Sequence, residues 1–300
     1  MGQVWVAGEV LIDLIPEGGD RKPVVGGGPA NTAKALAKIG IKTQFIDGIS
    51  SDQYGQMARD ELICAGVKLD YVKYSDLPTC IAIISLSESG SATYEFVIEN
   101  TATFDFTLDW LPKPQTDLPS ILYIGTLATV IEPSASVLFK WTQSVAKFAP
   151  VVFDPNIRPA VISDRAQYVA QVERWVATSS TVKVSDDDLN WLYPSLDIEQ
   201  VVNKWLIKGP SLVVVTHGDK GLTGYRKGEM VSVEAVRVKV ADTVGAGDTV
   251  GAILVEAIVK DGLDSLTGSR LEMMLKRAAE ASAITVSRVG ANPPTFQELE

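Results

Sequence analysis

Short apolar runs alternate with longer amphipathic segments over most of the chain. Six runs have the length and apolar character of buried strands, namely residues 4–7, 43–47, 121–124, 151–153, 182–184 and 212–216. Segments with helical periodicity lie between them, and two of these, residues 30–39 and 52–65, are followed by a glycine where a C-terminal cap is expected. This alternation predicts an α/β fold with a parallel sheet covered by helices on both faces.

Two β-rich runs interrupt the alternation. Residues 80–87 and 92–98 are separated by Glu88-Ser89-Gly90-Ser91, a connection typical of a hairpin. With residues 10–25 they predict a small accessory sheet, whose strands lie within about residues 10–25 and 80–103. A sheet of this size has little core of its own, so it either covers the main domain as a lid or pairs with a second copy of the chain to give a homodimer. No repeat or linker divides the sequence, and we expect one domain over residues 1–300.

The composition limits the classes of partner. With 27 Lys and Arg against 37 Asp and Glu, the formal net charge is −10, and no dense basic run is present to follow a nucleic acid or an anionic membrane. A bound phosphate would therefore depend on backbone amides, helix termini or a metal ion. Cys64 and Cys80 indicate neither a disulfide framework nor a thiolate metal site, and no segment reaches the roughly 18 apolar residues of a membrane span. We expect a cytoplasmic protein.

A junction of small residues between a strand-like segment and a helical one is the strongest candidate site. Gly245, Ala246 and Gly247 follow the β-branched stretch 236–240 and precede a helical pattern. Small residues there allow backbone N–H groups and the helix dipole to stabilise a phosphoryl group without a cationic side chain. Asp248 would repel that group unless it takes the proton of an attacking hydroxyl as a general base. From spacing alone, a structural N-cap is an equal alternative.

A second glycine cluster opens an earlier helix. Residues 26–28 are all glycine, and Asn31 follows at the start of the helical pattern. A sugar could approach this backbone closely while the Asn31 amide exchanges hydrogen bonds with its hydroxyls. Asp13 lies among apolar residues and, if buried, needs donors that sugar hydroxyls could supply. A tight turn and a water-facing Asp are the structural alternatives, and each feature taken alone favours them.

Several other enzyme classes are disfavoured by the motifs that the chain lacks. It has no Gly-Lys-Ser/Thr phosphate loop, no complete G-x-G-x-x-G and no G-x-S-x-G nucleophile elbow. The single histidine, His217, ends a predicted strand and has no second histidine for a metal site, so we assign it a structural role.

Taken together, the two glycine clusters and their order resemble the ribokinase-like (pfkB) family of carbohydrate kinases, bacterial fructokinases above all. Residues 242–248, Asp-Thr-Val-Gly-Ala-Gly-Asp, are similar to the specific family signature D-T-x-G-A-G-D, and the resemblance extends over essentially the whole chain. It implies a three-layer α/β/α fold with a mostly parallel central sheet and a small β-sheet lid. It also implies that Asp248 is the catalytic base and that the anion hole is formed by Gly245, Ala246 and Gly247. The positions that match sugar-binding residues of the family are Asp13, Gly27, Gly28 and Asn31.

Further segments resemble the parts of the family that bind ATP and metal ions. Residues 154–158 are similar to D-P-N-x-R, which makes Arg158 a candidate contact to substrate or phosphate, with a surface Arg as the alternative. The positions that resemble ATP-binding residues are Lys183, Thr216, Gly218, Gly221 and Asn292. Asp188 matches an acidic position that supports Mg²⁺, directly or through water, although an acid in the first turn of a helix explains it equally well. The family also implies a monovalent cation, usually K⁺, held mainly by the backbone carbonyls of Asp242, Val244, Thr285, Arg288 and Gly290.

One departure from the family concerns the substrate. Fructokinases of this family often carry an Arg shortly after the aromatic pair of the accessory strand, where this chain reads Ile98-Glu99. An acid there disfavours a phosphorylated or carboxylated substrate through like-charge repulsion. The resemblance therefore implies transfer of phosphate from ATP to a primary hydroxyl of a neutral sugar, fructose first, giving fructose 6-phosphate. The alternatives are a ribokinase, a nucleoside kinase or a 2-keto-3-deoxygluconate kinase of the same family, and a non-catalytic sugar or nucleotide sensor.

Overall fold

A largely parallel sheet forms the centre of the protein. The computed structural model describes residues 2–86 and 92–300. Within them, the main sheet has eight strands in the order β14 (Glu229–Val233), β13 (Leu222–Arg226), β12 (Leu212–Thr216), β11 (Thr181–Ser185), β10 (Val151–Asp154), β9 (Ile121–Gly125), β1 (Val4–Ala7) and β4 (Thr43–Ile46). The strands from β12 to β4 are parallel, and only β13 and β14 run antiparallel at one edge. The predicted parallel sheet is confirmed.

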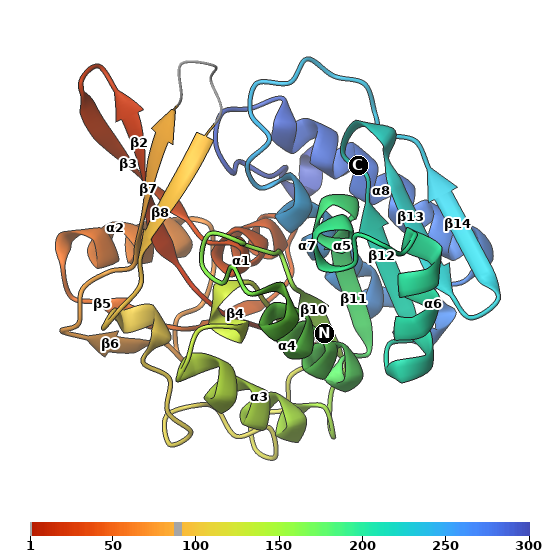
Figure 1. Cartoon of the computed structure of the whole chain (residues 1–300), viewed down its shortest axis with the longest axis horizontal. Coiled ribbons are helices and arrows are strands. Elements are labelled where there is room, and N and C mark those ends of the chain that lie inside the picture. Colours follow the sequence, from red (N-terminus) through yellow and green to blue (C-terminus); the bar gives the residue numbers. More distant parts are fainter. Residues whose placement is uncertain (1, 87–91) are drawn as a thin grey trace.

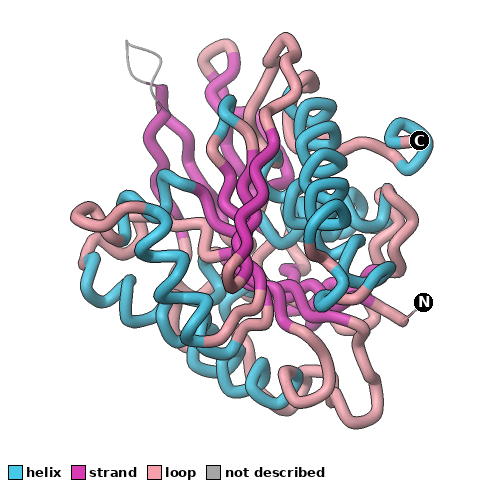
Figure 2. Tube along the Cα trace, turned by 90° about the vertical axis from the view of Figure 1, so that its right-hand side faces the viewer, coloured by secondary structure: helices cyan, strands magenta, loops and turns pink. Residues whose placement is uncertain are grey.

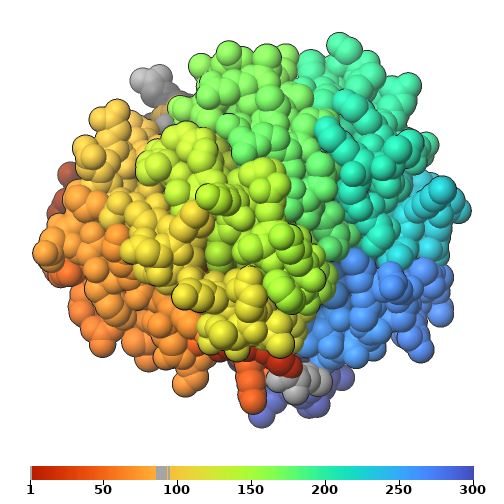
Figure 3. Space-filling model, turned by 90° about the horizontal axis from the view of Figure 1, so that it is seen from below, coloured from red at the N-terminus to blue at the C-terminus, as the bar shows by residue number. Residues whose placement is uncertain are grey.

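Helices cover both faces of this sheet. One face packs against α1 (Gly28–Lys38), α2 (Gln53–Cys64), α7 (Ala246–Asp261) and α8 (Gly268–Val286), and the other against α3 (Ser134–Val145), α4 (Arg165–Thr178), α5 (Asp186–Leu192) and α6 (Ile198–Lys208). Strand β1 shows how the sequence produces this arrangement, because Val4 and Val6 point into the first core and Trp5 and Ala7 into the second. Figure 2 shows the strands between the helices, and Figure 3 shows residues of about 50–100 on one side of the molecule and the C-terminal third on the other. The result is the three-layer α/β/α fold that the resemblance implied.

The accessory sheet lies at one end of the main sheet, above α1 and α2 in Figure 1. It consists of β3 (Asp20–Gly26), β2 (Leu11–Glu17), β7 (Ile81–Leu86) and β8 (Ala92–Val97), in that order. Two antiparallel hairpins, β2 with β3 and β7 with β8, are joined by parallel pairing of β2 and β7. The predicted strand segments are therefore confirmed, while the connection at Glu88 to Ser91 lies outside the described residues. A short parallel pair, β5 (Gly48–Ser50) and β6 (Lys73–Ser75), was not predicted.

Two buried carboxylates join the accessory sheet to the main sheet. Asp47, directly after β4, accepts hydrogen bonds from the Val10 backbone N–H at 2.7 Å and from the Thr103 hydroxyl at 2.6 Å, which belong to the chain entering β2 and leaving β8. Glu9 accepts from the hydroxyl of Thr126 and from the backbone N–H of Ala128 at 3.1 Å, beyond β9. Burial raises the pKa of Glu9 to about 7, against the opposing hydrogen bonds.

No helix in the described part of the chain has the length and apolar character of a membrane span.

The raised pKa of Glu9 predicts that the protein loses stability as pH rises. The folded-state pKa of about 7 lies above the ordinary glutamate value of 4.5. The stability that protonated Glu9 contributes is therefore fully present below the unfolded-state pKa. It is lost as pH rises through the folded-state pKa, which lowers the free energy of unfolding by about 3 kcal/mol in total. We expect chemical denaturation to give a lower free energy of unfolding at about pH 8.5 than at about pH 5.5, and a flatter dependence in Glu9→Gln. Parallel pH dependences of the two proteins would contradict this assignment.

Candidate active site

Asp248 lies in the first turn of α7, buried where α7 meets α1. Its Oδ2 accepts a hydrogen bond of 2.9 Å from Nδ2 of Asn31, and the residue is only 8% exposed to solvent. Burial raises the pKa of Asp248 to about 6, and the positive charge of Lys183 is the largest opposing influence. The helix begins after Gly245, which has φ +81°. A Cβ on this residue would lie 2.8 Å from the Cβ of Ala291, so only glycine fits. A buried carboxyl group with a raised pKa therefore lies directly after the glycine turn.

The N-terminus of α1 meets Asp248 from the other side. Gly27 precedes the helix with φ +103°, and a Cβ on Gly28 would lie 3.3 Å from Oδ1 of Asp248 and 3.2 Å from Nδ2 of Asn156. Asn31 is buried, and its Oδ1 has no hydrogen-bond partner among the described residues. Residues predicted from both glycine clusters are thus brought together, and the oxygen of Asp248 that Asn31 does not bind faces the glycine backbone of α1.

Asp13, on β2 of the accessory sheet, faces the same region. A Cβ on Gly26 would lie 2.2 Å from its Oδ2, so the carboxylate packs against the glycine cluster. Burial raises the pKa of Asp13 to about 6, while the charges of Arg158 and Lys34 oppose that shift. The guanidinium of Arg158 also lowers the pKa of Asp248, which places it within electrostatic range of both carboxylates. The predicted sugar-side residues therefore share one region between the accessory sheet, α1 and the loop after β10.

Lys183 lies beneath the first turn of α7. Its Nζ forms an ion pair of 2.8 Å with Oδ2 of Asp154, which also accepts a 2.8 Å hydrogen bond from the Tyr123 hydroxyl. A Cβ on Gly247 would lie 2.8 Å from this Nζ. Sequence reasoning assigned no role to Asp154 or Tyr123. The signal was present, because Asp154 ends one apolar strand and Lys183 interrupts another, and buried charges need partners.

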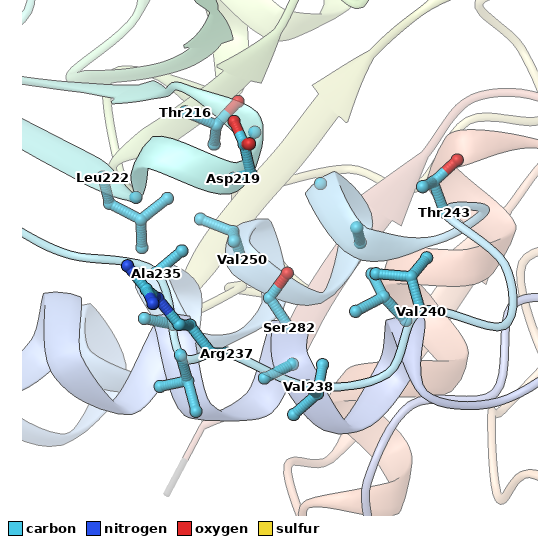
Figure 4. A pocket seen from close by; sticks show the side chains of 18 residues that line it. Thr216, Asp219, Leu222, Ala235, Arg237, Val238, Val240, Thr243, Val250 and Ser282 are labelled. Atoms are coloured by element: carbon cyan, nitrogen blue, oxygen red, sulfur yellow. The ribbon is translucent and has the colours of Figure 1, made fainter.

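A cleft of about 510 Å³ extends from the turn after β12 to the first turn of α7. It is lined by Thr216, Gly218 and Gly221 of the turn and by Ala246 and Gly247 of the helix start. Figure 4 shows the cleft, with Thr216 labelled on the side of the turn. Most of its wall is apolar and comes from residues 235–240 and from α8, as suits a flat aromatic base; among the described residues that line it, Arg237 is the only Lys or Arg. Asn292 does not line this cleft, and its Oδ1 accepts a hydrogen bond of 2.9 Å from Lys38.

His217 stands beside the cleft-lining turn. Its Nδ1 lies 3.4 Å from a carboxylate oxygen of Asp186, and its Nε2 lies 3.1 Å from the Thr223 hydroxyl. These contacts join β12, β13 and the start of α5, in keeping with the structural role expected from the sequence.

The residues proposed for metal ions form two groups. Both carboxylate oxygens of Asp188 accept hydrogen bonds from backbone N–H groups, that of Ile157 at 2.8 Å and that of Ser185 at 3.2 Å. The carboxylate therefore suits a metal ion held through water better than one held directly. Asp242 accepts from the backbone N–H of Val244 at 3.1 Å and of Gly290 at 2.9 Å. These bonds bring the segments 242–244 and 285–290 together. Among the described residues, no cluster of three or more His, Cys, Asp or Glu could hold a metal ion, but carbonyl ligands need no such cluster.

The comparisons with known proteins agree with this arrangement. Residues 1–297 match the pfkB family carbohydrate kinase. A fructokinase of Rhizobium leguminosarum bv. trifolii is 36% identical over 265 residues, covering 87% of this chain and 81% of that protein. The fructokinase of Xylella fastidiosa with bound ATP has a TM-score of 0.92 at 23% identity, covering 99% of this chain and 96% of that one. The fructokinase of Vibrio cholerae O395 in a fructose, ADP and calcium ion bound form has a TM-score of 0.85 at 26% identity, covering 100% of this chain and 96% of that one. This chain belongs to the pfkB family of carbohydrate kinases.

Proposed function

We propose that this kinase transfers the γ-phosphoryl group of ATP to a primary hydroxyl of D-fructose, giving fructose 6-phosphate. The observation that carries the proposal is the buried Asp248 carboxylate, with Asn31 on one oxygen and a glycine turn at a helix N-terminus beside it. The match to fructokinases, one of which binds fructose and ADP, supports fructose as the acceptor. ATP fits the mostly apolar cleft that ends at Gly247.

In this proposal Asp248 removes the proton from the sugar hydroxyl as its oxygen forms a bond to the γ-phosphorus. The bond between that phosphorus and the oxygen bridging to the β-phosphorus breaks, and ADP leaves with the bridging oxygen. Backbone N–H groups of Gly245, Ala246 and Gly247, with the dipole of α7, stabilise the charge on the phosphoryl oxygens. A divalent ion accompanying ATP would supply further positive charge, and Asp188 would hold it through water. The backbone carbonyls of Asp242, Val244, Thr285, Arg288 and Gly290 would hold K⁺.

A neutral sugar fits the charges around Asp248 best. Asp13 and Asn31 would bind its hydroxyls, with Gly27 and Gly28 allowing close approach and Arg158 on the side toward the phosphates. The carboxylates of Asp13 and Asp248 here are already opposed by the charges of Arg158 and Lys34 or Lys183, and Glu99, which is exposed just after β8, adds a negative charge at the edge of the accessory sheet. A phosphorylated or carboxylated acceptor would meet repulsion there.

A panel of acceptors tests the proposal. With Mg²⁺, K⁺ and ATP, we expect coupled ADP release to give the highest kcat/KM with fructose and much lower values with ribose, nucleosides and 2-keto-3-deoxygluconate. A higher kcat/KM for one of these other acceptors would reassign the substrate within the family. Saturable sugar binding in calorimetry without ADP release would instead favour the sensor.

The pH dependence of kcat/KM tests the two raised carboxyl pKa values. Asp248 and Asp13 both have a pKa raised to about 6 by burial, and the proposed base and hydroxyl acceptor act as carboxylates. The active fraction therefore falls as pH drops below about 6, and log kcat/KM for fructose should approach a slope of about two per pH unit. In Asp13→Asn the slope should fall to about one, because a single titrating group remains. An unchanged slope in that variant would remove Asp13 from the proposal.

A further inference from the structure

A buried acid, Glu9, lies in the chain between β1 and β2, four residues before Asp13. It is only 2% exposed. Its carboxyl group reaches the segment after β9, where Oε1 accepts hydrogen bonds from the Thr126 hydroxyl and from the Leu127 backbone N–H at 3.3 Å. Oε2 accepts from the backbone N–H of Ala128 at 3.1 Å. Glu9 therefore connects the start of the accessory sheet to the main sheet.

Thr126 has a backbone conformation that threonine rarely adopts. Its φ is 59° and its ψ is −146°, which is costly for a β-branched residue. Both branches of its side chain make contacts, since the hydroxyl donates to Glu9 and Cγ2 lies 2.8 Å from the point where a Cβ of Gly28 would stand. A glycine would adopt this backbone without strain but would make neither contact. The side-chain contacts, rather than the turn itself, therefore account for a threonine at this position.

The start of α1 is held by Glu9 at two points. A Cβ on Gly27 would lie 2.5 Å from the backbone oxygen of Glu9, so the residue before the helix packs directly against the main chain of this acid. Gly28, the first residue of the helix, packs against the methyl group of Thr126, whose hydroxyl is bound by the Glu9 carboxyl group. One buried acid thus contacts the helix start directly and through a second side chain.

These contacts join the two elements that carry the sugar-side residues. Strand β2 begins two residues after Glu9 and carries Asp13. Helix α1 carries Asn31, whose amide donates a hydrogen bond of 2.9 Å to Asp248. A small misplacement of reacting groups is sufficient for a large loss of rate. The position of the acceptor sugar relative to the proposed base therefore depends on the link through Glu9.

We propose that Glu9 and Thr126 are positioning residues for the acceptor sugar, because they hold β2 and the start of α1 at the spacing at which the sugar hydroxyl meets Asp248. The proposal rests on the sugar phosphorylation argued above and adds two buried residues that act through the elements they hold. The described residues that line the cleft predicted for ATP include neither of them, so loss of the link should affect the sugar and leave nucleotide binding unchanged.

A double-mutant cycle tests whether the two residues act as a unit. Glu9→Met removes the acceptor oxygens at similar length, and Thr126→Val removes the hydroxyl but keeps the methyl against Gly28. Each should lower kcat/KM for fructose by about tenfold or more, and the double variant should lose no more than the larger single loss. Losses that multiply would show two independent roles and overturn the proposal, as would single losses below about twofold.

Glu9→Gln provides a rescue within the same position. Its amide oxygen can still accept the hydrogen bond from Thr126, so this variant should recover most of the kcat/KM that Glu9→Met loses. Calorimetry with ADP and Mg²⁺, together with thermal unfolding, is measured on every variant. The nucleotide affinity of Glu9→Met and of Thr126→Val should stay within about threefold of wild type. No recovery in Glu9→Gln, or an equal loss of ADP affinity in the other two variants, would contradict a role in positioning the sugar.

A second-site change tests the contact between Thr126 and α1. Thr126→Ser keeps the hydroxyl for Glu9 and removes the methyl group that a Cβ on Gly28 would meet at 2.8 Å. Gly28→Ala/Thr126→Ser should therefore regain about tenfold of the kcat/KM for fructose that Gly28→Ala loses. If nothing is regained, this contact does not set the position of the helix start and the proposal is wrong.

The control changes another largely buried acid, on the opposite face of the main sheet. Glu173 of α4 accepts hydrogen bonds from the Tyr193 hydroxyl and from Nε1 of Trp205 at 3.2 Å. Glu173→Met should lower the unfolding temperature and keep the wild-type kcat/KM. A loss equal to that of Glu9→Met would show a general effect of removing a buried acid, which would also overturn the proposal. Absence of ADP release by wild type with every sugar would instead refute the proposed function, on which the positioning role depends.

Discussion

Asp248→Asn should lower kcat for sugar phosphorylation by roughly 10²- to 10⁴-fold, the usual contribution of a general base, with a small change in KM for ATP. The amide keeps the shape of the carboxylate and can still accept the hydrogen bond from Asn31, so the packing of α1 against α7 should persist. It cannot take a proton from the sugar. Steady-state kinetics with ATP and fructose, together with thermal unfolding, measure both parts of the expectation.

A second aspartate at a helix start gives the control. Asp164 is the N-cap of α4, and its carboxylate accepts hydrogen bonds from the backbone N–H groups of Ala166 at 2.9 Å and Gln167 at 3.1 Å. Asp164→Ala should cost about 1 kcal/mol of stability and leave kcat unchanged. If Asp248→Asn behaves in the same way, losing stability and keeping its turnover, Asp248 is a helix cap and the base must be sought elsewhere.

The main elements of the fold could be predicted because burial leaves local patterns. A run such as Val4 to Ala7 is apolar throughout, and a parallel strand between two helical layers requires this. The short pair β5 and β6 was missed, since Gly48–Ser50 and Lys73–Ser75 have three residues each and too little sequence for a period. What selects them is tertiary, namely the burial of Asp47 beside Gly48.

The candidate site was predictable where glycine was needed and less so elsewhere. Gly245 is required by a positive φ and by contact with Ala291, and such a requirement appears directly in the sequence. The hydrogen bond between Asn31 and Asp248 joins residues 217 positions apart, so no local spacing could indicate it. The same applies to Tyr123, Asp154 and Lys183, which are brought together by the order of strands in the sheet. The raised pKa values follow from burial, which exists only in the folded chain.

Gly28→Ala should lower kcat/KM for fructose by about 10²-fold or more while leaving ATP binding nearly unchanged. The added Cβ would stand 2.8 Å from Cγ2 of Thr126, which is closer than carbon atoms pack. Thr126 cannot easily move away, because its backbone has a positive φ of 59° and its hydroxyl is bound to the buried Glu9. The N-terminus of α1 must therefore shift, and it carries the Asn31 amide that holds Asp248. The cleft predicted for ATP is not lined by residue 28, so nucleotide affinity measured by calorimetry should persist.

Gly40→Ala is the matched control for this prediction, because Gly40 follows the other end of the same helix. It has φ +86°, and a Cβ there would have nothing within 4 Å, so the substitution adds backbone strain and no contact. It should cost about 1 kcal/mol of stability and keep kcat/KM near wild type. If both alanine variants lose stability but keep kcat/KM, the close approach at Gly28 serves only helix packing. If Gly28→Ala alone loses kcat/KM, then a displacement at the start of α1 has moved the acceptor away from Asp248, since a small misplacement of reacting groups is sufficient for a loss of this size.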